Sequence, residues 1–187
     1  GGTKRWHGQR VASGVSANPQ DNLFDPDQGP LRDYLGINGR VKECPSLQKP
    51  ARDGALNAFE AGSGGYGYNH NYIGGRNDLF GFPTDADPRA SLHSARVDEV
   101  HTAEKTLMFT DAAIQQKAGK YLIEYSFAEP PYIQSDPGPP SQSRTIPSIH
   151  FRHKGSCNVV WVDGHVNSRS LVFTRHATGN LYERLGF

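Results

Sequence analysis

A segment near the C-terminus carries the strongest structural signal in this chain of 187 residues. Two extended runs, 158–162 and 165–168, flank the pair Asp163-Gly164. An Asp-Gly pair supplies the two positive-φ positions of a two-residue type I′ turn, which joins neighbouring antiparallel strands. The segment therefore predicts a β-hairpin with Asp163 and Gly164 in its turn. Because side chains alternate along a strand, Val160 and Val162 should face away from Val159 and Trp161.

Other segments are rich in residues that favour strands. Thr106–Thr110 is typical of a buried strand that ends at Asp111, and Tyr121–Phe127 of a second strand. Ile149–His153 should form a short strand that leads into the hairpin. These strands follow one another and are joined by loops, so we expect a mainly antiparallel sheet. One short helix is expected over Gln28–Leu35, where apolar residues fall at helical spacing.

Turn-forming residues limit the rest of the fold. The chain contains 21 glycines and 13 prolines, which predicts many turns and few long helices. The segment 129–148 carries six of these prolines and should be a long loop. We expect a single α+β domain over residues 1–187, with short helices and long loops. We expect Gly1, and Gly2 as a further candidate, to be left from cloning, because no methionine precedes them.

Charge and hydropathy exclude two classes of protein. Lys plus Arg is 20 and Asp plus Glu is 19, a net charge of +1. A nucleic-acid binder usually has a basic excess, so no nucleic-acid partner is expected. No window reaches the roughly 18 apolar residues that a membrane span requires.

The glycine pattern Gly62–Gly67 matches Gly-x-Gly-x-x-Gly. Phosphate binding needs such a loop between a buried strand and a helix, and neither flank has that character here. No nucleotide or other organic cofactor is therefore expected. Calcium remains an alternative at two acidic groups, beside the ordinary role of Asp in turns. These groups are Asp21, Asp25 and Asp27, and Asp85 and Asp87.

One cluster near the hairpin has residue types that carry chemistry: His150, His153, Asp163 and His165. On a regular strand, His150 and His153 would point to opposite faces, which weakens a shared metal site. We favour a structural role in which His153 bonds the backbone of a neighbouring loop. No catalytic residue is expected under that interpretation. The alternative is a secreted metal-dependent hydrolase or metal-binding domain that uses all four residues.

Two further features leave alternatives open. The stretch Tyr66–Tyr72 could be a carbohydrate- or peptide-binding strip through Tyr66, Tyr68 and Tyr72, but packing is favoured. Cys44 and Cys157 lie outside any Cys-x-x-Cys pair. They could form a disulfide or remain free thiols, depending on the redox compartment.

The order of several local signals resembles a known family. Along the chain come Cys44-Pro45-Ser46, Tyr66-Gly67-Tyr68-Asn69, Thr106–Asp111 and Arg152–Val166. The last segment contains His153, nine further residues, and then Asp163-Gly164. This pattern is similar to the prepilin-type, processing-associated family named for that spacing, whose members are pseudopilin-like proteins. The resemblance covers roughly residues 39–169.

The resemblance implies a fold and a function. Members begin with a basic leader and a long apolar helix, which this sequence lacks, so we expect it to be the trimmed periplasmic head. The head would be a non-enzymatic structural subunit of a type II secretion or type IV pilus-like assembly in the cell envelope. Its partners would be other pseudopilin subunits or secretion-system components, with membrane contact only through the missing helix. The resemblance implies the motif His153, Asp163 and Gly164 without a catalytic role for it.

Overall fold

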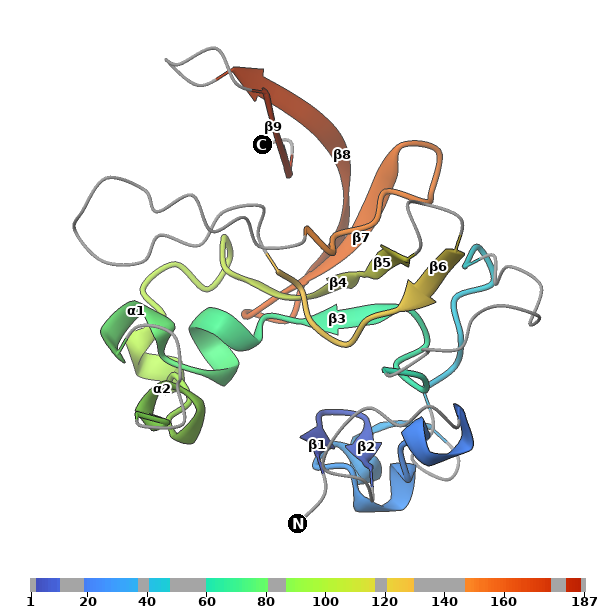
Figure 1. The fold of residues 1–187 in the computed structure, drawn as a ribbon. Coiled ribbons are helices and arrows are strands. Elements are labelled where there is room, and N and C mark those ends of the chain that lie inside the picture. Colours follow the sequence, from blue (N-terminus) through green and yellow to red (C-terminus); the bar gives the residue numbers. More distant parts are fainter. Residues whose placement is uncertain are drawn as a thin grey trace. The chain divides into compact units, whose positions relative to one another are not determined.

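The computed structural model describes residues 3–10, 19–36, 41–47, 60–80, 87–116, 121–129, 147–175 and 181–185 (Figure 1). The chain divides into two compact units. Unit 1 comprises Gly1–Gly67 and Ala112–Ser126, and unit 2 comprises Tyr68–Asp111 and Phe127–Phe187. The chain crosses from one unit to the other after Gly67, after Asp111 and after Ser126. Each unit is thus built from two separate stretches, and neither corresponds to one continuous part of the sequence.

Unit 1 contains two small antiparallel sheets. β1 (Lys4–Arg5) pairs with β2 (Gly8–Gln9), and β5 (Ala113–Gln116) pairs with β6 (Tyr121–Glu124). The strand expected over Tyr121–Phe127 is therefore shorter and ends at Glu124. The core of the unit joins remote segments. It contains Cys44, Leu47 and Ala113, with Tyr66 and Leu122 packed against them.

The helix expected over Gln28–Leu35 is not an α-helix. The region forms the 3₁₀ turns η2 (Pro26–Gln28) and η3 (Arg32–Tyr34), after η1 (Pro19–Asn22). Gly29 separates η2 from η3 in an extended conformation, with φ −75° and ψ 140°. Pro30 follows and lacks the N–H that a continuous helix would use, so the apolar spacing is not enough to form a longer helix.

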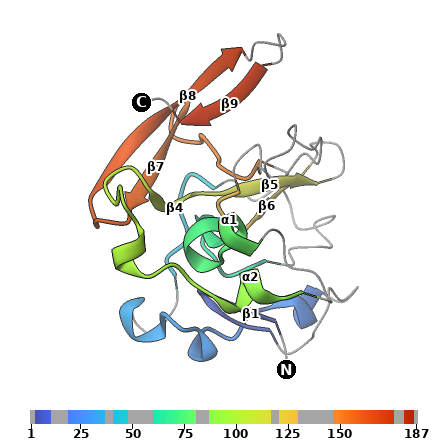
Figure 2. The ribbon, with the colours of Figure 1, turned by 90° about the vertical axis from the view of Figure 1, so that its left-hand side faces the viewer.

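The sheet of unit 2 has the strand order β3-β4-β7-β8-β9 (Figure 2). Its strands are β3 (Tyr66–Tyr68), β4 (Leu107–Asp111), β7 (Ser156–Trp161), β8 (Val166–Arg175) and β9 (Leu181–Leu185); only Tyr68 of β3 belongs to unit 2. The pairs β4–β7, β7–β8 and β8–β9 are antiparallel. The predicted strand that ends at Asp111 and the antiparallel character of the sheet are confirmed.

The helices of unit 2 are short. They are η5 (His70–Gly74, a π-helix), α1 (Asn77–Phe80), α2 (Arg89–Leu92) and η6 (Val97–Glu99). None of the helices in the described part of the chain combines the length and apolar character needed to cross a bilayer. Mostly antiparallel sheets with few short helices agree with the predicted α+β class. Residues 130–146 of the predicted proline-rich loop lie outside the described residues.

The β7–β8 hairpin is confirmed, but its turn differs from the prediction. The Gly164 N–H donates to the Trp161 carbonyl, and the Trp161 N–H donates to the His165 carbonyl. The loop thus has three residues, of which only Gly164 has a positive φ, 90°. Asp163 Oδ1 accepts the His165 backbone N–H at 3.1 Å. This local bond stabilises Asp163 at an ordinary φ, and a type I turn followed by a left-handed glycine results.

The short strand expected over Ile149–His153 is absent, because the chain already turns at its end. His153 and Ser156 exchange backbone hydrogen bonds of 2.9 and 3.1 Å. Between them, Lys154 has φ 56° and Gly155 has φ 83°. Two consecutive positive φ values are the property of the two-residue turn that the sequence analysis assigned to Asp163-Gly164.

Side-chain alternation on β7 agrees with the prediction. Cys157, Val159 and Trp161 are buried together, while Val160 lies between them on the other face. Leu107, Ile149 and Phe151 pack against this cluster. The hairpin therefore supplies the core of unit 2 from one face of a single strand.

Replacing Gly164 with Val should lower the free energy of unfolding by about 1–2 kcal/mol, because a β-branched residue is strained at positive φ. No atom lies within 4 Å of a Cβ added at Gly164, so the cost is conformational and not steric. Gly164→Asn should cost less, since Asn tolerates this region. Chemical denaturation of both variants checks the assignment, and equal stability of the Val variant and the wild type would contradict it.

Candidate functional site

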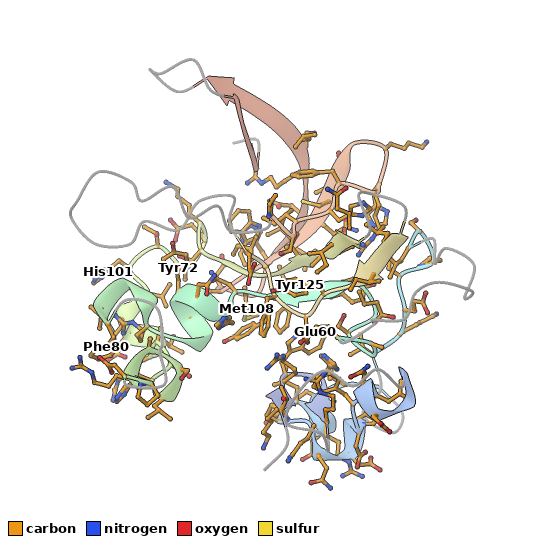
Figure 3. The ribbon with its side chains drawn as sticks, viewed as in Figure 1. Glu60, Tyr72, Phe80, His101, Met108 and Tyr125 are labelled. Atoms are coloured by element: carbon orange, nitrogen blue, oxygen red, sulfur yellow. The ribbon has the colours of Figure 1, made fainter. Side chains whose placement is uncertain are left out.

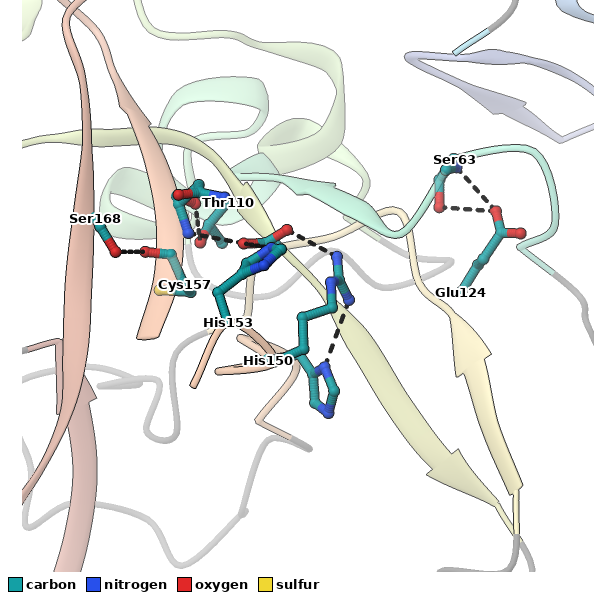
Figure 4. Close-up of polar contacts among 11 residues, drawn as sticks. Ser63, Thr110, Glu124, His150, His153, Cys157 and Ser168 are labelled. Atoms are coloured by element: carbon teal, nitrogen blue, oxygen red, sulfur yellow. Dashed lines mark hydrogen bonds and ion pairs between the residues drawn. The ribbon is translucent and has the colours of Figure 1, made fainter. Parts of the chain in front are cut away.

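The carboxylate of Asp111, at the end of β4, is fully buried and lies at the centre of the candidate site in unit 2 (Figure 4). Oδ1 accepts a hydrogen bond from Arg152 Nη2 at 2.9 Å. Oδ2 accepts the backbone N–H of Asn158 at 2.7 Å, and His153 Nε2 lies 3.2 Å from the same oxygen. One buried anion is thus bonded by a cation, a backbone amide and an imidazole.

The sheet register brings these groups together. Thr110 on β4 lies opposite Val159 on β7, and its hydroxyl donates to the Asn158 carbonyl at 2.9 Å. Asp111 follows Thr110 and therefore reaches the Asn158 amide. The backbone carbonyl of Asp111 accepts the His150 N–H at 2.9 Å. Asp111 thereby connects β4, the start of β7 and the segment that precedes it.

His150 belongs to the same group through Arg152. Its Nδ1 lies 3.4 Å from Arg152 Nη1. Burial lowers the pKa of His150, and the nearby Arg152 charge lowers it further. The expectation that His150 and His153 point to opposite faces is wrong, since it assumed a regular strand and the chain bends here. Both rings lie around the pair of Arg152 and Asp111.

The other two residues of the predicted cluster form a separate pair in the hairpin turn. His165 Nδ1 lies 2.7 Å from Asp163 Oδ1, and both side chains are exposed. The backbone hydrogen bond from His165 lowers the pKa of Asp163. The His165 ring stacks on Trp161 at 5.6 Å between centroids.

The structure therefore divides the four-residue cluster into two pairs. Within the described residues of unit 2, no three His, Cys, Asp or Glu side chains bring ligand atoms close enough to share one metal ion. Sequence reasoning missed Asp111 and Arg152 as members of the site. The available signal was a charged residue at the end of a strand predicted to be buried, where an ion partner becomes necessary.

The acidic groups considered for calcium take part in turns and caps. Asp25 caps η2 by accepting the Asp27 N–H at 3.0 Å. Asp27 accepts from Arg32 at 3.1 Å, and Asp87 pairs with Arg89 at 2.7 Å. Asp21 is exposed at η1, and Asp85 lies outside the described residues.

The glycine loop Gly62–Gly67 binds an anion that belongs to the chain itself. The backbone N–H groups of Gly62 and Gly64 each donate to Glu124 Oε2 at 2.9 Å. The Ser63 hydroxyl lies 3.4 Å from the same oxygen (Figure 4). Gly62 and Gly64 have φ values of 105° and 66°, which glycine adopts readily. The donors that a phosphate would need are thus occupied by a buried carboxylate of β6.

A second buried carboxylate in unit 1 was also missed from the sequence. Glu60, labelled in Figure 3, binds the guanidinium of Arg5 through both oxygens, with distances of 2.9–3.1 Å. The Ser126 hydroxyl donates to the same carboxylate. Trp6 Nε1 donates to the Ser126 carbonyl at 2.9 Å. These bonds join β1, the glycine loop and the end of the 112–126 stretch.

The three tyrosines considered as a binding strip are half-buried. Tyr66 packs against the core of unit 1. Tyr68 contacts the Phe109 ring at 5.0 Å, and burial raises its pKa. Gly74 approaches the Tyr68 ring so closely that no Cβ would fit. These contacts favour packing.

Cys44 and Cys157 are both buried, and the structure contains them as free thiols. The disulfide considered from the sequence is therefore not formed here. Burial is the main cause that raises the pKa of the Cys157 thiol.

One buried histidine in unit 1 was not singled out by sequence reasoning. His7 is only 2% exposed and lies between Trp6, at 5.1 Å, and Phe24, at 4.8 Å. Burial, and secondarily the charge of Arg5, lower its pKa from 6.5 to about 4. The ring is therefore neutral at pH 7.

A comparison of the chain with protein-family models, curated proteins and solved structures found no match.

Asp111→Asn should lower the free energy of unfolding by about 3–5 kcal/mol, because Arg152 is left as a buried charge without its anion. The double variant Asp111→Asn, Arg152→Met should recover part of that loss, since both charges are then removed. Urea denaturation of the two single variants and the double variant gives the coupling free energy. Additive effects would contradict a direct buried ion pair.

His7 should make stability depend on pH. Its pKa is about 4 in the folded chain and 6.5 when unfolded, so the folded state disfavours the proton. The resulting stability is fully present above pH 6.5 and is lost as the pH falls toward 4; the whole contribution is roughly 3 kcal/mol. Denaturation of wild type and His7→Phe between pH 7 and pH 4.5 measures it. The variant should have the shallower pH dependence, and identical slopes would contradict the assignment.

Proposed function

We propose that this chain is the head of a non-enzymatic, pseudopilin-like structural subunit. The observation that carries the proposal is how the fold uses the residues of the family motif. His153 contacts the buried carboxylate of Asp111, and Asp163-Gly164 forms part of the turn between β7 and β8. Both ends of the motif thus contribute to one hairpin and its anchoring. A motif used in this way fits a structural role better than a catalytic one.

The proposed function is assembly in the bacterial cell envelope. Heads on the periplasmic face of the inner membrane pack side by side with other pseudopilin subunits or secretion-system components, in a type II secretion or type IV pilus-like system. Membrane contact comes only through an apolar helix that precedes the head. The short helices of unit 2 support such packing, since each exposes a large apolar side chain. These are Leu79 in α1, Leu92 in α2 and Val97 in η6.

The metal-dependent hydrolase is less well supported. It would need His150, His153, Asp163 and His165 in one coordination sphere, whereas the two pairs lie at different ends of β7. The carbohydrate- or peptide-binding module would need an exposed aromatic strip. Its three tyrosines are half-buried, and two have packing partners.

The assembly is tested by crosslinking in native membranes. A photoreactive residue replaces Val97, which is 84% exposed, in the full gene product. Crosslinked species that rise in steps of one subunit are expected. The same residue at the exposed Ser168 of β8 serves as the matched control and should give fewer products. Monomer alone at both positions, or a gene without an apolar segment of roughly 20 residues upstream, would refute the proposal.

His153→Ala should lower the free energy of unfolding by about 0.5–1.5 kcal/mol, the value of one hydrogen bond. The metal content of the purified protein should not change. Elemental analysis together with denaturation measures both quantities, and His101→Ala, at an exposed site, is the control. A stoichiometric transition metal in the wild type that is lost with an activity in the variant would favour the hydrolase instead.

A further inference from the structure

We propose that unit 1 binds a small, uncharged aromatic molecule that carries a hydroxyl group, in a cavity beside His7. The cavity has a volume of about 270 Å³ and lies entirely within unit 1. The described residues that line it are His7, Leu23, Phe24, Pro26, Val41, Ala61 and Gly62. The site is independent of the family motif, so the proposal goes beyond the assembly function.

His7 is the polar group that requires a partner. The side chain is buried, and neither Nδ1 nor Nε2 has a hydrogen-bond partner among the described residues. Buried polar atoms in folded proteins are almost always bonded, since an unsatisfied one retains its full desolvation cost. A ligand that bonds the ring would remove that cost. His7 therefore marks the polar end of the site.

Space for a ligand atom exists next to Nδ1, on the side of Gly62. A Cβ built on Gly62 would lie 3.5 Å from Nδ1 and 3.8 Å from Cε1 of His7. Apart from Gly62 and its chain neighbours, no other heavy atom lies within 4 Å of that point. The φ of 105° at Gly62 favours glycine, so the chain conformation itself leaves this space without a side chain.

The walls define the chemistry of the ligand. Apart from His7, the lining side chains are apolar, which suits a hydrophobic body. Phe24 is an aromatic wall against which a flat ring can stack. An engineered cavity of about 150 Å³ holds a benzene molecule, so this cavity has room for a substituted ring.

The charge state of the site selects an uncharged ligand with a hydroxyl group. His7 is neutral at pH 7, so its ring offers one N–H donor and one acceptor nitrogen. A hydroxyl group can donate to the acceptor or accept from the donor. Arg5, the nearby cation, is bound by Glu60 at 2.9 Å, and no charged residue is among the lining residues. The cavity thus has no counter-charge for an ion.

The test is a titration of the full chain with phenol and with toluene, which lacks the hydroxyl. Phenol should shift the NMR signal of His7 Cε1–H saturably and bind roughly three- to tenfold more tightly than toluene, the value of one neutral hydrogen bond. In His7→Phe the preference for phenol should disappear. Leu23→Trp, at a lining position that is half exposed, should block both ligands while His7 stays in place.

His101→Phe is the matched control, because His101 is exposed and lies outside unit 1. It should retain the affinity of the wild type for phenol. Equal binding of phenol and toluene would refute the hydrogen bond to His7. A site that binds neither probe, or binding that persists unchanged in Leu23→Trp, would overturn the proposal as a whole.

Discussion

The buried ion pair of Asp111 and Arg152 is the interaction on which the fold of unit 2 depends most directly. The unit has one sheet and only short helices, so its loops need fixed points of their own. Asp111 provides such a point, since its side chain and backbone bond Arg152, His150 and the start of β7. A pair of buried charges adds little net stability over an apolar core. It does impose a strong geometric requirement, because either charge alone is very costly.

Unit 1 follows the same principle with two other carboxylates. Glu60 binds Arg5 and Ser126, while Glu124 accepts hydrogen bonds from the glycine loop. In each case an anion joins segments that are remote in sequence and have no long helix or wide sheet to hold them. A loop rich in glycine fits this arrangement, because its N–H groups can converge on one oxygen. The pattern Gly62–Gly67 is therefore explained by internal anion binding and not by a nucleotide.

Local features were predictable from the sequence, and long-range ones were not. The hairpin, the strand that ends at Asp111 and the buried face of Val159 and Trp161 follow from patterns within a few residues. The turn type was missed because the Asp163 side chain bonds its own backbone neighbour, which a residue pair alone does not reveal. The partnership of Asp111 with Arg152 spans 41 residues, and no periodicity encodes it. His7 was likewise hidden, since its burial depends on Phe24 and on the glycine loop.

The interrupted build of the two units has a consequence for the order of folding. Trp6 bonds Ser126 across 120 residues, and Arg5 bonds Glu60 across 55. During synthesis the N-terminal segment must therefore wait, without its final partners, until more than half of the chain has been made. Contacts of such high sequence separation slow folding, because loop closure has to precede the stabilising bonds. Until then Trp6 and Phe24 stay accessible, and a nascent chain of this kind is a natural client for chaperones that bind exposed aromatic segments.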